Sequence, residues 1–206
     1  MRMDHLERLS RYSLSDPDNV SILVLNYSAD QFEKIFSKME FVTAIRFITE
    51  ISGKLSIPIN YANKEVSDNT LIRKFIDEKT SERSRFLPAM TAYDDRFREG
   101  FMRYIPQKGK VISVRSEDAF TSSTLIKSVS DSGRKAIYIC GFRTEVDVNI
   151  TALSCLSHGF FPVVVSDATS TFSERSFYSA LDSMSQVVEV IDTRDLIKLW
   201  GDIDQL

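Results

Sequence analysis

The segment that most constrains the fold is residues 136–152, AIYICGFRTEVDVNITA. It begins with an apolar run, passes through a turn at residues 141–144, and then has acidic residues, Glu145 and Asp147, where a helix would start. In an open α/β sheet, the carboxyl end of a strand that feeds a helix N-terminus is where ligands and nucleophiles commonly lie. The segment therefore predicts an α/β fold and the place of its site.

Six short apolar runs predict strands, and helical patterns lie between them. The runs show little polar alternation, as is typical of strands buried on both faces. They cover residues 21–26, 56–61, 111–115, 136–140, 162–166 and 187–191. Helices are predicted over residues 30–51, 121–132, 145–157, 173–183 and 193–200. This alternation predicts a three-layer α/β/α sandwich with a six-stranded, mostly parallel, Rossmann-like sheet.

The length predicts one domain, because 206 residues that are 43% hydrophobic can bury a substantial core. Residues 1–18 are polar and mixed in charge, so we expect an N-terminal arm or short helix, not a signal peptide, ahead of a domain at 19–206. Residues 65–109 interrupt the alternation of strands and helices. They contain charged helical segments and aromatic residues that look exposed: Phe97, Phe101 and Tyr104. This region is either an ordinary helical excursion or a lid and oligomer contact.

The charge and residue counts exclude several classes of function. The net charge is −3 and the charges are interspersed, so no nucleic-acid partner is expected. No apolar run approaches the roughly 20 residues of a membrane span, and a cytoplasmic protein is expected. Two cysteines and two histidines predict no disulfide, metal site or cofactor. We interpret Cys140, Cys155 and His158 as ordinary packing or helix-end residues.

The segment at 136–152 and its flanks resemble the isochorismatase-like (cysteine hydrolase) family. The family's pattern here is roughly C–G–hydrophobic–x–T–E–V–Cys–V–x–x–T–A. Other spaced matches, before and after this segment, are Phe120, Thr124, Leu125, Gly133, Gly159, Val163, Asp167 and Ala168. The resemblance implies a six-stranded parallel α/β/α sandwich. It also implies a cis peptide bond, which here would join Phe142 and Arg143.

The family's hydrolases use three residues, and this chain differs at each position. An aspartate at the end of the first strand is the general base. A lysine at the end of the third strand keeps that aspartate ionised and helps to orient the reacting groups. A cysteine at the helix start attacks the carbonyl of the substrate. The matching positions are Asn26, Val114 and Asp147, although Arg115 could take the lysine position. An amide cannot take up a proton at neutral pH, valine carries no charge, and a carboxylate is a poor nucleophile toward amides. The resemblance therefore predicts loss of amide hydrolysis by the family mechanism.

The expected pocket combines the residues around the turn with the strand ends beside it. They are Asn26, Arg115, Phe120, Gly141, Phe142, Arg143, Thr144 and Asp147. Asp147 is either a helix first-turn acid stabilised by the helix dipole or a new acid or ligand contact. Arg143 either points into the pocket, toward Asp147 or an anionic ligand, or projects to solvent or a neighbouring subunit.

Two hypotheses of function follow. In the first, the chain is a non-catalytic binding or assembly subunit, either a homo-oligomer or a hetero-oligomer with a related, active subunit, with a small-molecule ligand as a further partner. The stretch 93–104, or the final helix with Trp200, would supply the subunit contacts. In the second, it is a divergent hydrolase that acts on an isochorismate-like or small amide substrate through Asp147.

Overall fold

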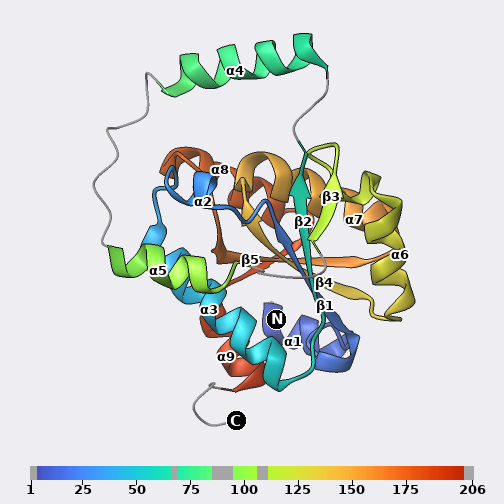
Figure 1. Ribbon diagram of the computed structural model, residues 1–206. Helices are drawn as coiled ribbons and strands as arrows, with labels where there is room; N and C mark the ends of the chain where they lie inside the picture. Colours follow the sequence, from blue (N-terminus) through green and yellow to red (C-terminus); the bar gives the residue numbers. More distant parts are fainter. Residues whose placement is uncertain (1–3, 66–68, 85–94, 106–110, 202–206) are drawn as a thin grey trace.

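The structure, a computed structural model, describes residues 4–65, 69–84, 95–105 and 111–201 (Figure 1). Its centre is one six-stranded sheet in the order β3–β2–β1–β4–β5–β6, with every neighbouring pair parallel. The strands are β1 (Val20–Leu25), β2 (Ile59–Lys64), β3 (Val111–Val114), β4 (Ala136–Phe142), β5 (Phe161–Ser170) and β6 (Glu189–Ile191). The predicted six-stranded parallel sheet is confirmed.

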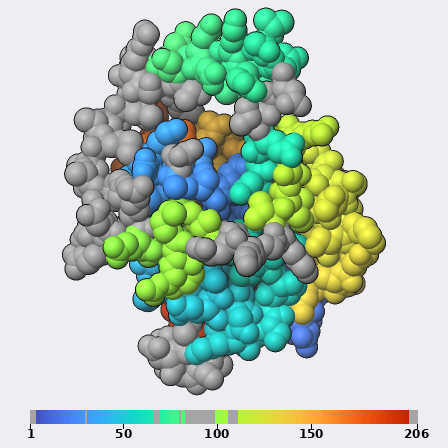
Figure 2. All heavy atoms as spheres, in the orientation of Figure 1, coloured from blue at the N-terminus to red at the C-terminus, as the bar shows by residue number. Residues whose placement is uncertain are grey.

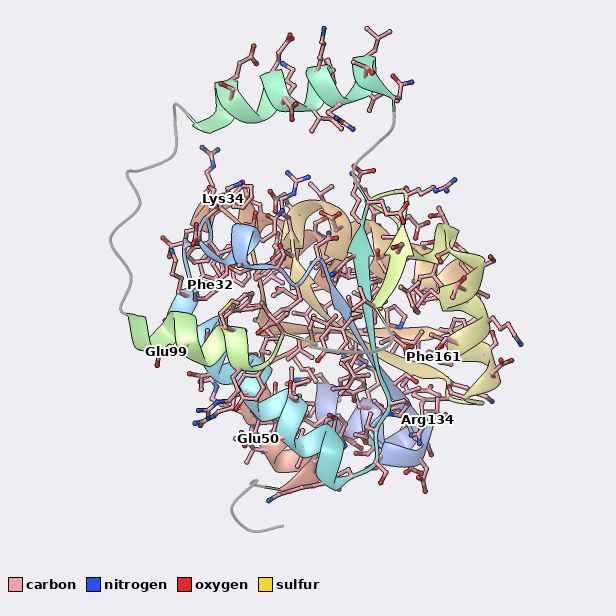
Figure 3. The ribbon with its side chains drawn as sticks, in the orientation of Figure 1. Phe32, Lys34, Glu50, Glu99, Arg134 and Phe161 are labelled. Carbon is pink, nitrogen blue, oxygen red and sulfur yellow. The ribbon has the colours of Figure 1, made fainter. Side chains whose placement is uncertain are left out.

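Helices cover both faces of the sheet, which confirms the α/β sandwich (Figures 1 and 3). The first face carries α1 (His5–Arg11), α3 (Lys38–Lys54), α5 (Asp95–Arg103) and α9 (Thr193–Trp200). The second face carries α6 (Ser123–Asp131), α7 (Asn149–Ser157) and α8 (Glu174–Ser185). The shorter elements are η1 (Pro17–Asn19), α2 (Ala29–Phe32), η2 (Ala119–Thr121) and η3 (Thr144–Val148).

Two hydrophobic cores lie on either side of the sheet because strand side chains alternate between its faces. In β1, Ile22 and Val24 belong to the first core, whereas Leu23 and Leu25 belong to the second. All four are almost fully buried. Burial on both faces accounts for the continuous apolar runs from which the strands were predicted.

The strand order has a topological switch point between β1 and β4. The chain moves outward from β1 through β2 to β3, then returns to the centre and moves outward again from β4 through β5 to β6. In open sheets of this kind a crevice forms outside the carboxyl ends of the two central strands. The fold therefore places the expected site at the residues that follow Leu25 and Phe142.

Several element boundaries differ from the sequence prediction, and two of the differences are informative. The helix expected over 30–51 is two helices, α2 and α3. Between them the Phe36 N–H donates to the Thr171 carbonyl at 3.2 Å, and the hydroxyls of Ser37 and Ser170 lie 2.7 Å apart. These hydrogen bonds hold the residues between α2 and α3 against the end of β5, and they replace the hydrogen bonds of a continuous helix. The second strand runs over 59–64 and not 56–61, which adds Asn63 and Lys64 to its end.

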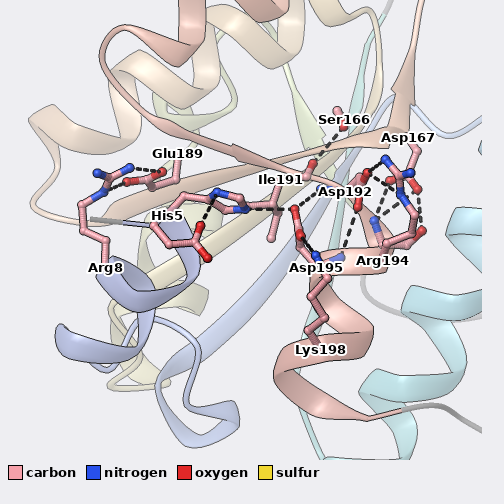
Figure 4. Close-up of polar contacts among 12 residues, drawn as sticks. His5, Arg8, Ser166, Asp167, Glu189, Ile191, Asp192, Arg194, Asp195 and Lys198 are labelled. Carbon is pink, nitrogen blue, oxygen red and sulfur yellow. Dashed lines mark hydrogen bonds and ion pairs between the residues drawn. The ribbon is translucent and has the colours of Figure 1, made fainter. Parts of the chain in front are cut away.

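The N-terminal segment packs against the last strand and helix (Figure 4). Arg8 of α1 pairs with Glu189 of β6, and His5 Nε2 lies 3.1 Å from Asp195 Oδ2 of α9. The indole N–H of Trp200 donates to the Ser15 carbonyl at 2.7 Å. Trp200 is 7% exposed and its side chain holds the N-terminal segment, so the indole itself faces inward. That the final helix supplies subunit contacts stays a prediction.

The described part of residues 65–109 contains two helices. Helix α5 packs against the rest of the domain, whereas α4 (Thr70–Ser84) stands apart from it (Figure 2). Phe101 of α5, expected to be exposed, is fully buried, with ring centroids 4.3 Å from Phe32 and 4.4 Å from Tyr27. The side chain of Phe97 lies outside the described residues. In α4, four large apolar side chains are exposed: Leu71, Ile72, Phe75 and Ile76. No described helix is long and apolar enough to cross a membrane.

Candidate functional site

Asn26 follows β1 at the switch point and connects the two neighbouring strands. Its side-chain N–H₂ donates to the Phe142 carbonyl at 3.0 Å, and its Oδ1 accepts from the Lys64 N–H at 2.8 Å. The residue has φ of 49°, a left-handed conformation that asparagine tolerates better than most residues. Both ends of the amide are thus used to join β4 and β2 across the end of β1.

Gly141 allows β4 to approach β1 closely at this point. Its φ is +107°, and a Cβ built there would lie 2.1 Å from the Leu25 carbonyl oxygen. No side chain fits against backbone at that distance. The sequence pattern therefore needs a glycine here for steric reasons, and β4 continues from it to the Phe142 carbonyl that Asn26 contacts.

The turn into α7 contains the expected non-proline cis peptide bond between Phe142 and Arg143. It is followed by η3, a single π-helical turn in which the Val148 N–H donates to the Arg143 carbonyl at 3.1 Å. Such turns inside helices are rare and are frequent at functional sites. Here the turn places Asp147 against Arg143.

Asp147 is buried against the turn, with 4% of its surface exposed. Its Oδ2 accepts the Arg143 N–H at 3.3 Å and lies 3.6 Å from Arg143 Nε. Burial raises the pKa of the Asp147 carboxyl, while Arg143, a hydrogen bond from Asn26 and the charge of Lys64 act in the opposite direction. Of the two readings of Arg143, the structure thus places the guanidinium at Asp147, with 30% of the side chain exposed.

Two charged residues that the sequence analysis did not select lie beside this group. Lys64, the last residue of β2, pairs with Glu117 in the loop after β3. This pairing lowers the pKa of the Glu117 carboxyl, and the charge of Arg143 lowers it further. Lys64, Glu117, Arg143 and Asp147 thus form one polar cluster at the carboxyl ends of β2, β3 and β4, which we call the charge cluster. A strand predicted to reach residue 64 would have revealed the lysine.

Val114 and Arg115, the two residues considered for the lysine position, point in different directions. Val114 is in register with Lys64, and its side chain is buried in the second core. Arg115 points outward, its side chain 90% exposed and its Nε 3.6 Å from Glu65 Oε2. The structure therefore does not bring Arg115 together with the other residues selected for the pocket, because the next residue along a strand faces the other way.

Three further residues selected for the pocket lie in packed surroundings. Phe120 belongs to the second core, where its ring centroid is 5.2 Å from that of His158. Phe142 belongs to the first core, with its ring centroid 4.5 Å from that of Phe41. Thr144 is fully buried at the start of η3, next to Arg143, and its hydroxyl has no hydrogen-bond partner among the described residues.

Neither cysteine can substitute for a nucleophile at the turn. Cys140 and Cys155 are both free and fully buried in the two cores. Burial raises the pKa of each thiol, which disfavours the reactive thiolate. Among the described residues, no group of three or more His, Cys, Asp or Glu side chains could hold a metal ion. What the cluster offers chemically is two carboxylates and two cations, suited to charge recognition and proton transfer.

Known proteins share sequence with this chain. An isochorismatase domain matches residues 35–195. The probable hydrolase YcaC of Escherichia coli (strain K12) is 39% identical over 83 residues, which is 40% of this chain and 37% of that protein. The phenazine biosynthesis protein PhzD of Pseudomonas fluorescens is 30% identical over 80 residues, 38% of this chain and 39% of that protein. The matched segments thus span about two fifths of these curated relatives.

Solved structures show the same fold over nearly the whole chain. The Escherichia coli YcaC gene product, described as an octameric hydrolase of unknown specificity, superposes with a TM-score of 0.63 at 20% identity, covering 93% of this chain and 84% of that one. A cysteine hydrolase from Pseudomonas syringae gives 0.67 at 16% identity, covering 92% and 94%. The domain match shows that this chain belongs to the isochorismatase family, and the solved structures share its fold.

Proposed function

We propose that this chain does not hydrolyse amides through a cysteine and acts as a binding or assembly subunit on the isochorismatase fold. The observation that carries the proposal is the state of Asp147, at the family's nucleophile position. Its carboxylate is buried and held by the Arg143 N–H and guanidinium. A carboxylate held in this way is a poor nucleophile, because attack would require it to leave its cationic partner.

The position of the family's general base supports the same conclusion. Asn26 uses its amide to join β4 and β2, through Phe142 and Lys64. It has no ionisable group, so it cannot take a proton from a nucleophile at neutral pH. The backbone arrangement of the site is thus present, but the pair of a general base and a thiol nucleophile is not.

The assembly part of the proposal rests on α4. Its exposed apolar side chains are spaced at one and four residues, so they share one face of the helix: Leu71, Ile72, Phe75 and Ile76. A single short helix that stands in water is marginally stable, and an apolar face is normally buried against a partner. We assign a second copy of this chain as that partner, by analogy with the octameric YcaC structure. A related, triad-complete subunit is the alternative.

One observation favours a second function. Burial raises the pKa of the Asp147 carboxyl in spite of the opposing cations, and burial is one means by which enzymes keep a carboxyl protonated as a proton donor. In that case the protein is a divergent hydrolase for an isochorismate-like or small amide substrate. Asp147 would donate the proton to the leaving group.

One experiment separates the two. Purified protein and its Asp147→Asn variant are assayed at high concentration with isochorismate, nicotinamide, simple amides and N-carbamoyl compounds. The binding or assembly role predicts no turnover by either protein. Turnover by the native protein that disappears in the variant would overturn it and establish the acid. Light scattering on the same samples gives the oligomer mass, and a mass of one chain at micromolar concentration contradicts the assembly role.

A further inference from the structure

Helix α7 presents an apolar face that its own domain leaves partly uncovered. Ile150, Leu153 and Leu156 follow one another at intervals of three residues, so they lie on one side of the helix. Their exposed fractions are 41%, 42% and 39%. We call these three side chains the α7 face.

Helix α7 also differs in charge from the other helices that cover the same side of the sheet. Its residues, Asn149–Ser157, include no Lys, Arg, Asp or Glu. The exposed surfaces of α6 and α8, by contrast, carry charged side chains such as Lys127 and Glu174. A helix with one side in water normally has charged or polar residues on that side. The composition of α7 therefore fits a helix whose outer side is covered as well.

The α4 face is the second surface of this kind. We define it by the four exposed apolar side chains of that helix: Leu71, Ile72, Phe75 and Ile76. Each of the other described helices exposes at most one large apolar side chain. Figure 1 shows α7 on the body of the domain and α4 apart from it. Because both faces are exposed, they do not cover each other within one chain.

The area of the two faces distinguishes between the possible pairings. At roughly 150 Å² for a whole large side chain, the exposed parts amount to about 350 Å² for the α4 face and about 200 Å² for the α7 face. Pairing of α4 with α4 would bury about 700 Å² in a dimer, and pairing of α7 with α7 about 400 Å², both below the size of a specific interface. If α4 of each chain packs on α7 of the other, the total is about 1,100 Å², which reaches that size.

We propose that α4 of one chain packs against α7 of a second copy, and that the contact is reciprocal, so that a two-fold dimer contains it twice. The inference rests on the assembly role proposed above and names the surface of the second copy that α4 occupies. The two faces match chemically, because both are apolar and α7 brings no charge that the contact would have to desolvate. The contact would also stabilise α4, since a short helix alone in water is marginally stable.

The test places single cysteines on the two faces, which is feasible because both native cysteines are buried. Phe75→Cys and Leu153→Cys chains are prepared separately, mixed until subunits have exchanged, and treated with a short bismaleimide cross-linker. We expect covalent dimers in the mixture and few or none with either variant alone. In a separate measurement, Leu153→Ser should raise the dissociation constant of the assembly by at least about tenfold, because it removes a central apolar contact.

Helix α4 supplies the matched control. Asp77 is two residues from Phe75 and therefore lies on the opposite side of the helix. Asp77→Cys mixed with Leu153→Cys should give no covalent dimer.

Three outcomes would overturn the inference and leave the assembly role standing. The first is an equal yield of covalent dimer from Phe75→Cys alone, which would pair α4 with α4. The second is a cross-link within a single chain that carries both cysteines. The third is an assembly of several chains whose mixture gives no covalent dimer. A native mass of one chain at micromolar concentration would instead contradict the assembly role and this inference together.

Discussion

Lys64 and Val114 are register partners at the ends of β2 and β3, and their side chains lie on the same face of the sheet. Val114, which the resemblance matched to a lysine position, carries no charge, whereas its register partner Lys64 is a cation. The ammonium group reaches Glu117, and its charge acts on Asp147. A lysine at the end of β2 therefore supplies a positive charge beside both carboxylates.

The buried state of Asp147 predicts a specific dependence of stability on pH. Because the folded-state pKa is raised above the ordinary value of 3.8, the folded protein binds more protons than the unfolded chain between these two pKa values. This group therefore lowers stability as pH rises through that interval, by about 1.4 kcal/mol for each pH unit spanned. Asp147→Asn should remove the effect.

The measurement compares the free energy of unfolding of native protein and Asp147→Asn from pH 3.5 to 7. We expect the difference between them to shift in favour of the variant as pH rises, and then to become constant. Asp131→Asn, at an exposed i,i+4 pair with Lys127 on α6, serves as the control for loss of an ordinary carboxylate. A difference that moves in favour of the native protein with rising pH would contradict the burial argument.

The close approach of β4 to β1 predicts that Gly141 cannot be replaced. In Gly141→Ala the new methyl group would lie 2.1 Å from the Leu25 carbonyl oxygen, at a backbone φ of +107°. The two strands would have to separate, so we expect a loss of more than about 3 kcal/mol in the free energy of unfolding. Denaturant unfolding monitored by circular dichroism measures this loss.

Gly53 provides the matched control for that substitution. It lies in α3, and a methyl group added there would meet no atom of another element within 4 Å. Gly53→Ala should therefore stabilise the protein, by about 0.5–1 kcal/mol, because alanine is the better helix former. Equal effects of the two substitutions would show that the β1–β4 contact is looser than the structure has it.

How far the sequence predicts this molecule can be seen in β4 and β2. Residues 136–140 are continuously apolar and are followed by Gly141, so the sequence predicts both the strand and the turn after it. In β2, the polar residues Asn60, Asn63 and Lys64 interrupt the apolar pattern, and the prediction placed the strand three residues too early. These polar groups are accommodated by tertiary partners, such as Ser128 for Asn60, which a sequence does not reveal.

In the candidate site too, the sequence predicts what a local pattern determines and misses what long-range contacts determine. Asn26, Arg143 and Asp147 lie on or beside a recognisable motif, and the structure brings them together. Lys64 and Glu117 join them only through the pairing of β2 with β3, which is a long-range contact. Arg115 was selected because of its charge, whereas the alternation along β3 turns it outward. The final helix was named with Trp200 as a source of subunit contacts, and the indole of Trp200 is used within the chain.

The exposed face of α4 predicts a concentration-dependent mass. If Phe75, which is 61% exposed, contacts a second copy, Phe75→Ser should reduce the oligomer mass measured by light scattering. The unfolding free energy of the monomeric unit should change by less than about 0.5 kcal/mol, because the side chain is largely exposed within its own chain. Lys74→Ser, on the polar side of the same helix, should leave the mass unchanged. A lower mass in both variants would indicate loss of the helix and not of an apolar contact.

Lys64 is expected to control the ionisation of both carboxylates in the cluster. Lys64→Met keeps much of the aliphatic stem and removes the charge. The pKa of Glu117 should then rise toward its ordinary value, because its main stabilising partner is gone, and the pKa of Asp147 should rise further above its own. Titration of ¹³C-labelled carboxyl groups by NMR measures both.

Arg115→Met is the control for this substitution, because it removes a cation of equal charge from the adjacent strand. Its side chain is 90% exposed, so both pKa values should stay unchanged. Each substitution should also cost less than about 1 kcal/mol in stability, as is usual for ion pairs that solvent reaches. If the pKa of Asp147 stays constant in Lys64→Met while that of Glu117 rises, Lys64 serves the outer carboxylate alone, and the cluster is two independent ion pairs instead of one electrostatic unit.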